Sequence, residues 1–312
     1  MTAMSAFKNI LLIGASGFIG GFILEAFKSD GSFNLALLQR ASSKSRLPGH
    51  LKIITIADSY PTEELLAAFQ GQDVIINCIA GLSVGDQFRM IDAAIAAKVQ
   101  RYIPSEFGLN NMNPKAQALN PVFGVKGQIQ RYLRAKSDEG LIEWMSITNG
   151  IWLEWAVENG FMGWFFKEKR FVLWGDGTGY FSCTTVPNTA AGLVRALKMR
   201  DETKNRNIFL SDFATTQKQL LDAIERIEGV RYKVESIDGE KVIAEKQEEV
   251  RRGIESAASI YPLIEGGFAT GKYGGHLEEE PGVVIMNERF GLPKKTLDEV
   301  VAAALRIVGA ST

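Results

Sequence analysis

Three glycines near the start of the chain have a spacing that could bind phosphate. They fall at positions 14, 17 and 20, directly after the apolar run 10–13 and before an apolar segment that predicts a helix. At such a strand-to-helix turn the first N–H groups of the helix have no partner within it and can bind a pyrophosphate. A side chain at Gly14 or Gly17 would block the turn or the phosphates, and one at Gly20 would push the helix off the strand. The segment predicts a dinucleotide site, with a turn that holds no ligand as the alternative; its candidate contacts are Gly14, Ala15, Ser16, Gly17, Phe18, Ile19 and Gly20.

Basic residues after the second apolar run bear on the choice of dinucleotide. This run, 33–38, leads into Arg40 and Lys44, and no Asp or Glu occurs between positions 38 and 46. An acidic side chain at the end of this strand would accept from the ribose 2′-OH of NAD, whereas a basic one accommodates the 2′-phosphate of NADP. The planar guanidinium of Arg40 can also stack on adenine. We therefore predict NADPH, with Arg40 and Lys44 as contacts; a solvated basic loop is the alternative, most of all for Arg46.

The fold has to position these candidate site residues. Strand and helix patterns alternate through the first half of the chain. Alternation with short connections is typical of βαβ units on a parallel sheet. The sequence predicts an α/β protein with a Rossmann doubly wound parallel sheet in residues 1–150. Residues 151–312 change to an aromatic-rich segment followed by helices, and we expect a smaller C-terminal α+β region that covers the substrate and is partly interleaved with the first domain. The expected strands are 10–13, 33–38, 51–56, 74–79, 101–105 and 142–148.

Composition excludes several other functions. The 312 residues include 35 Lys plus Arg and 36 Asp plus Glu, so the net charge of -1 argues against a nucleic-acid-binding surface. Two cysteines and two histidines, far apart in sequence, make a disulfide framework or a metal site improbable. No apolar run is long enough to span a membrane, and we expect a cytoplasmic protein.

Small and polar residues follow the expected strands at their carboxyl ends. Ligands of doubly wound sheets bind beyond these ends. Backbone and small polar groups there would line the nicotinamide side of the site. The candidate cofactor contacts are Cys78, Ile79, Ala80, Ser105, Glu106, Phe107 and Asn149.

Several segments together are similar to one known family. The glycine loop 14–20, the Pro-Ser-Glu-Phe-Gly run 104–108 and the Val-Phe-Gly-Val-Lys run 122–126 resemble the isoflavone reductase-like group. This group belongs to the NmrA-like, atypical short-chain dehydrogenases, and its plant members include phenylcoumaran benzylic ether, pinoresinol–lariciresinol and leucoanthocyanidin reductases. The resemblance extends through segment 171–177 and implies an NADPH-dependent oxidoreductase of secondary metabolism. Asn149 resembles the asparagine that the family has after its sixth strand.

By this resemblance Lys126 is the candidate catalytic residue. Ordinary short-chain dehydrogenases use Tyr-x3-Lys, but the residue four positions before Lys126 is Val122, so the lysine is kept and the tyrosine is absent. Lys126 could donate a proton beside hydride transfer, since an apolar surrounding and the positive nicotinamide would lower its pKa. Alternatively it only binds the ribose and the carboxamide of the cofactor. A second match, Tyr132 with Lys136, ends too close to the sixth strand to reach the nicotinamide.

An aromatic segment follows the sixth strand and is the candidate substrate region. Most of its aromatic side chains are expected in the core, while one or two could stack on a flat aromatic substrate. Here the sequence departs from the plant enzymes, so their substrates do not carry over. The candidate substrate contacts are Gly108, Trp152, Phe161 and Trp164.

Two functions fit these observations. The first is an NADPH-dependent reductase, a monomer or homodimer, that transfers hydride to a C=C, C=N or benzylic ether bond of an aromatic small molecule. The second is a non-catalytic NmrA-like regulator that senses dinucleotide and binds a protein partner. The retained Lys126 favours the reductase.

Overall fold

The structure, a computed structural model, describes residues 6–79 and 81–310. The chain forms two compact units that are interleaved in sequence. The first unit comprises Met1–Glu106, Val125–Ile147 and Ala190–Ile208, and the second comprises Phe107–Gly124, Thr148–Thr189 and Phe209–Thr312. Among the described residues, no helix is both long enough and apolar enough to cross a membrane.

A seven-stranded sheet with helices on both faces forms the first unit. Strands β1 to β6 pair in parallel, and the predicted α/β fold with a doubly wound parallel sheet is confirmed. The β1 residues Ile10 to Ile13 are at most 1% exposed, as expected for a strand covered on both faces. The sheet order is β10 (Arg206–Phe209), β6 (Glu143–Thr148), β5 (Arg101–Ile103), β4 (Val74–Asn77), β1 (Asn9–Ile13), β2 (Asn34–Arg40) and β3 (Lys52–Ile56).

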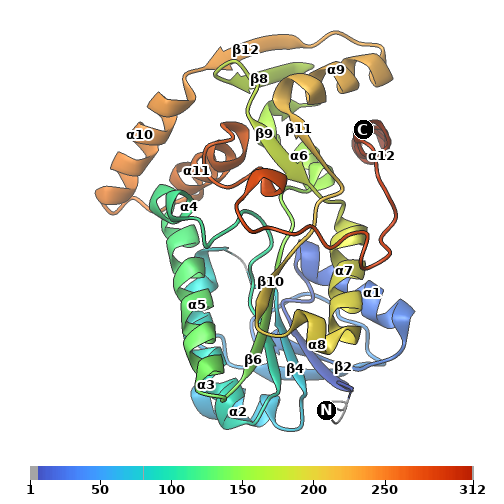
Figure 1. Ribbon diagram of the computed structural model, residues 1–312, viewed down its shortest axis with the longest axis vertical. Coiled ribbons are helices and arrows are strands. Elements are labelled where there is room, and N and C mark those ends of the chain that lie inside the picture. The colour runs from blue at the N-terminus through green and yellow to red at the C-terminus, as the bar shows by residue number, and fades with distance from the viewer. Residues whose placement is uncertain (1–5, 80, 311–312) are drawn as a thin grey trace. The chain divides into compact units, whose positions relative to one another are not determined.

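The helices of this unit divide between the two faces of the sheet. In Figure 1, α2, α3 and α5 run along one face, and α1 and α7 lie along the other. Their bounds are α1 (Phe18–Asp30), α2 (Thr62–Phe69), η1 (Gly81–Asp86), α3 (Gln87–Ala96), α5 (Pro121–Asp138), α7 (Val186–Lys198) and α8 (Arg200–Thr203).

The seventh strand, β10, was not expected, and it explains why the units are more interleaved than a boundary at residue 150 suggests. A buried ion cluster binds residues 200–203, which precede β10, to strands β5 and β6 of the sheet. Arg101 on β5 is fully buried and donates to Glu143 at 2.8 Å and to the hydroxyl of Thr203 at 3.0 Å, while Arg200 donates to the same carboxylate. Of the four residues of β10, only Ile208 is buried. The sequence of β10 therefore lacks the apolar run that marks the other strands.

The second unit is an α+β region built on two small sheets and an aromatic core. One sheet pairs β11 (Phe213–Thr216) with β9 (Tyr180–Cys183), and the other has the order β12 (Lys233–Ile237), β8 (Arg170–Trp174) and β7 (Trp164–Phe165). Thr296 caps the last helix, because its hydroxyl accepts from the N–H of Glu299. The helices are α4 (Pro114–Leu119), α6 (Leu153–Glu158), η2 (Phe161–Gly163), α9 (Gln217–Glu228), α10 (Gly239–Arg251), α11 (Ala257–Ala269), η3 (Leu277–Glu279) and α12 (Leu297–Ala310).

Candidate functional site

Two of the three loop glycines let the backbone of the first unit pack closely. Gly14 has a φ of 83°, and a Cβ placed there would lie 2.7 Å from the carbonyl oxygen of Cys78. A Cβ on Gly20 would lie 2.0 Å from the carbonyl oxygen of Gly14. Both contacts are too short for real atoms, so any larger residue would separate the turn from β4 or from α1. These glycines are required by the fold itself.

Gly17 has a different role, because an added side chain there would meet only one atom of the protein closely. It is the N-cap of α1 in an extended conformation, it is exposed, and no side chain caps the helix. A Cβ on Gly17 would approach the Gly14 carbonyl oxygen only to 3.3 Å. The loop therefore presents an uncapped helix N-terminus beneath a residue without a side chain, which is the cradle that a pyrophosphate requires.

The end of β2 brings together residues that bear on cofactor choice. Arg40 ends the strand and is exposed, and Lys44 is also exposed. The carboxylate of Asp58 accepts a hydrogen bond from the N–H of Ser42 at 3.0 Å. Hydrogen bonds from Ser42 and, more weakly, the charge of Arg40 hold the pKa of Asp58 below its ordinary value. Asp58 follows β3, and only the pairing of β2 with β3 brings it near Arg40, so the residues after β2 give no sign of it in the sequence.

The carboxyl ends of β4 and β5 meet through side chains. Ser105 donates from its hydroxyl to the carbonyl of Ile79 at 2.9 Å, and its N–H donates to Gln87 at 2.8 Å. Cys78 is buried, and burial raises the pKa of its thiol, which stays protonated. The structure thus places Cys78, Ile79 and Ser105 together, as the sequence predicted for these strand ends. Ala80 lies outside the described residues.

Lys126 lies on α5 against the end of β5. Its ammonium donates to the backbone carbonyl of Glu106. Burial lowers the pKa of Lys126, and the negative charge of Glu106 partly offsets that effect. The Glu106 side chain is fully buried, and its carboxylate accepts from the amide nitrogen of Gln130 at 2.7 Å. The site therefore holds a lysine whose proton is more easily released than that of a solvated lysine.

The other Tyr-x3-Lys match on α5 is engaged elsewhere. Tyr132 donates to Asp92 on α3, and Lys136 pairs with Glu139 at 3.1 Å. Lys136 lies ten residues after Lys126 on the same helix, a distance of about 15 Å along its axis. Both side chains are bound at the far end of α5 from Lys126.

Residues predicted on the substrate side belong to the second unit. Trp152 is half-buried and its ring lies 6.3 Å from that of Phe107, while its indole N–H donates to Thr189. Trp164 is fully buried and donates to the hydroxyl of Tyr232, and Phe161 is 7% exposed. Packing accounts for the positions of Trp164 and Phe161, so a substrate contact by either one remains a prediction that our proposal does not use.

Two further predicted residues lie at backbone turns of this unit. Gly108 has a φ of 154° and its carbonyl accepts from the N–H of Gly150 at 3.0 Å. Asn149 is fully buried, and its side-chain oxygen has no hydrogen-bond partner among the described residues. This oxygen is the kind of acceptor that a ligand N–H could satisfy.

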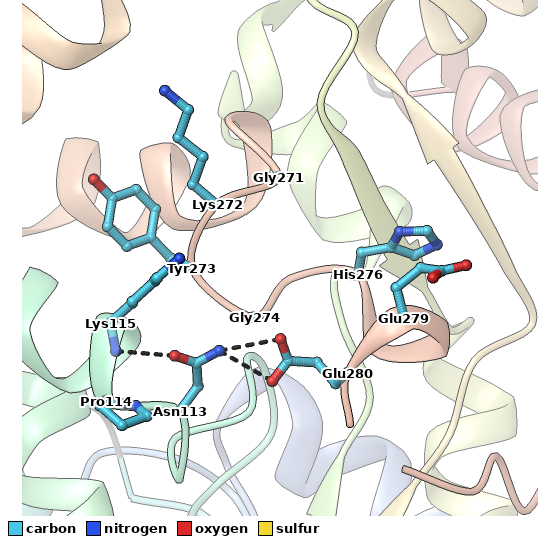
Figure 2. A pocket seen from close by; sticks show the side chains of 10 residues that line it. All are labelled: Asn113, Pro114, Lys115, Gly271, Lys272, Tyr273, Gly274, His276, Glu279 and Glu280. Atoms are coloured by element: carbon cyan, nitrogen blue, oxygen red, sulfur yellow. Dashed lines mark hydrogen bonds between the residues drawn. The ribbon is translucent and has the colours of Figure 1, made fainter. Parts of the chain in front are cut away.

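A cavity of about 820 Å³ in the second unit was not foreseen from the sequence. Figure 2 shows the amide of Asn113 donating to both carboxylate oxygens of Glu280, at 3.0 and 3.1 Å. In the same view Lys272 and His276 point in different directions, and Lys272 pairs with Glu240. The walls are fixed by ion pairs and amide contacts, and the lining includes none of the residues predicted for the site.

Comparison with known proteins decides the family. The sequence profile of the NmrA-like family matches residues 6–143. Over 300 residues the chain is 32% identical to oxidoreductase aprR of Aspergillus flavus, which covers 96% of this chain and 99% of that protein. The chain belongs to the NmrA-like family. Because this similarity extends over nearly the full length of both chains, the NmrA-like protein is an oxidoreductase.

Solved structures show the same fold. An isoflavone reductase crystal structure matches with a TM-score of 0.75 at 21% identity, covering 96% of this chain and 99% of that one. The binary complex of leucoanthocyanidin reductase and NADPH from Vitis vinifera matches with a TM-score of 0.73 at 17% identity, covering 96% and 99%. The predicted resemblance of this NmrA-like protein to the isoflavone reductase-like group is confirmed.

Proposed function

We propose that this protein is an NADPH-dependent reductase that transfers hydride to a C=C, C=N or benzylic ether bond of an aromatic small molecule. The observation that carries the proposal is Lys126, an ammonium group with a lowered pKa at the carboxyl end of β5. It lies in the same unit as the uncapped glycine loop. A proton donor and a dinucleotide cradle in one unit are what a reductase of this kind needs.

The residues of the first unit fit NADPH. Gly17, which has no side chain, and the N-terminus of α1, which no side chain caps, would take the pyrophosphate. The exposed guanidinium of Arg40 would take the 2′-phosphate, with Lys44 as a second cation. The leucoanthocyanidin reductase structure of similar fold was solved with NADPH, which supports this choice. When bound, NADPH supplies the hydride.

Lys126 would complete the reduction by moving one proton. Addition of a hydride to carbon leaves the electron pair of the broken bond on the neighbouring atom. Nζ of Lys126 would donate its proton to that atom and recover one from water, so charge and protons balance. Glu106 holds Nζ through its backbone carbonyl, which fixes the direction of donation. In the second unit, the partly exposed pair Phe107 and Trp152 offers an aromatic surface of the kind on which a flat ring stacks.

Turnover tests the proposal directly. The purified protein is mixed with NADPH and a panel of aromatic acceptors that carry enone, imine or benzylic ether groups, and NADPH oxidation is followed by absorbance at its nicotinamide band. We expect oxidation with at least one acceptor class and one reduced product per NADPH consumed. Tight NADPH binding without turnover on any class would instead support the dinucleotide-sensing regulator.

Cofactor preference gives a sharper prediction. Arg40→Asp should weaken NADPH binding by roughly 10- to 100-fold, because a charge-assisted hydrogen bond to phosphate contributes about 1.5–3 kcal/mol. NADH binding should change little or improve. Asp58→Asn is the matched control with the opposite sign, since removing the carboxylate beside Arg40 should strengthen NADPH binding. Calorimetry that finds equal affinity for NADPH and NADH in the unaltered protein would contradict the assignment.

A further inference from the structure

Glu106 carries a carboxylate that the proposed chemistry does not use. Its side chain is fully buried in the first unit, where an unpaired charge would be costly. The carboxylate instead faces α5 and accepts from the amide of Gln130 at 2.7 Å. The carboxylate is turned toward the helix that carries Lys126, and the cofactor contact expected of Glu106 stays a prediction.

Glu106 therefore holds two adjacent side chains of α5. Lys126 and Gln130 are four residues apart and lie on the same face of the helix. The backbone carbonyl of Glu106 accepts from Lys126, and its carboxylate accepts from Gln130. Glu106 thus binds this face of α5 through two groups, its backbone carbonyl and its carboxylate. The hydrogen bond from Gln130 orients the carboxylate relative to the ammonium of Lys126.

The charge of Glu106 also acts on Lys126. Burial favours the neutral amine, and the negative charge of Glu106 favours the ammonium. Of the acidic groups near α5, Asp92 binds Tyr132 and Glu139 pairs with Lys136, both of which lie further along the helix, and the charge of Glu106 is the one that acts on Lys126. The protonation of Lys126 thus depends on its burial and on the charge of Glu106, whose carboxylate accepts a hydrogen bond from the Gln130 amide.

We propose that Glu106 is a positioning residue for Lys126: its backbone carbonyl aims the ammonium, and its carboxylate is held by Gln130 one turn further along the same face of α5. This inference rests on the proposed function only where it concerns turnover; the coupling between the two side chains stands independently of it. The ammonium form is the proton donor, and it is present below the pKa of Lys126. Removing the negative charge lowers that pKa, so the donor form is lost at a lower pH.

The test measures the titration of Lys126 in the full chain without cofactor. The protein is labelled with ¹³C-lysine, the Cε signal of Lys126 is assigned by its loss in Lys126→Arg, and the signal is followed against pH. We expect the midpoint to move to lower pH in Glu106→Gln and to remain near that of the unaltered protein in Glu106→Asp, which keeps the charge. Asp92→Asn, which removes an exposed carboxylate that also binds α5, should leave the midpoint unchanged.

A second variant covers the case in which Glu106→Gln does not fold. Gln130→Met removes the amide donor, which disfavours the charged form of the buried carboxylate, and should move the Lys126 midpoint in the same direction by a smaller amount. An unchanged midpoint in the folded variants overturns the inference. If an acceptor is found, the alkaline limb of kcat should shift with the midpoint while KM for NADPH stays the same.

Failure of this inference and failure of the proposed function give different results. A shifted midpoint in a protein that reduces no acceptor would leave the coupling intact and remove the proposed function. Turnover that depends on Lys126 but has an unshifted midpoint in Glu106→Gln would keep the proposed function and remove this inference.

Discussion

Replacing Lys126 with alanine is expected to slow the chemical step by roughly 10²–10⁴, the usual contribution of a general acid. The residue at position 122, one turn earlier on α5, is a valine and has no proton to give. Lys126 is held by the Glu106 carbonyl and its pKa is lowered by burial, so it is suited to donate near neutral pH. NADPH affinity should fall much less, because the glycine loop and Arg40 bind the other parts of the cofactor.

Single-turnover kinetics at saturating NADPH separate the step from binding. Lys136→Ala is the matched control, since Lys136 lies on the same helix and pairs with Glu139, and it should keep the full rate. Lys126→Arg should also be slow, because a guanidinium keeps the charge but hardly releases its proton. Should saturating NADPH restore the rate of Lys126→Ala, the lysine is a cofactor ligand and the proton comes from elsewhere.

Features that depend on residues close together in sequence could be predicted without the structure. The glycines at 14, 17 and 20 follow a strand that is apolar on both faces, and the periodic pattern of the first half fixes the parallel sheet. In such segments the local pattern and the fold agree, because a strand that is buried on both sides has to be apolar throughout. The family resemblance then singled out Lys126, which lies on α5.

Contacts across the chain were not visible in the same way. Asp58 lies beside Arg40 because β2 and β3 pair in parallel, with Arg40 opposite Ile56. Gln130 is an ordinary polar residue in sequence and gains its role only when the loop after β5 places Glu106 against α5. Strand β10 follows a segment that a buried ion cluster holds, and its own four residues contain no apolar run. In each case tertiary pairing outweighs the local signal.

The loop glycines give the second large prediction, in which two similar substitutions have different consequences. Gly17→Val should weaken NADPH binding by roughly 100-fold or more, because the branched side chain occupies the phosphate position and displaces hydrogen bonds to charged oxygens. The fold should persist, since Gly17 is extended and its Cβ would meet the Gly14 carbonyl oxygen only at 3.3 Å. Calorimetry for binding and a melting curve for stability measure the two effects separately.

Gly20→Val is the comparison that makes the result specific. Its Cβ would lie 2.0 Å from the Gly14 carbonyl oxygen, so α1 has to move away from the turn. Overpacking of this kind costs about 1–3 kcal/mol or more, and Tm should fall together with affinity. Gly17→Val should lose affinity with a much smaller fall in Tm, because its contact with the protein is a 3.3 Å approach that a small shift relieves, whereas its clash with the ligand is not relieved. Normal NADPH binding by Gly17→Val would show that the phosphates lie elsewhere, and the turn would then be a feature of packing alone.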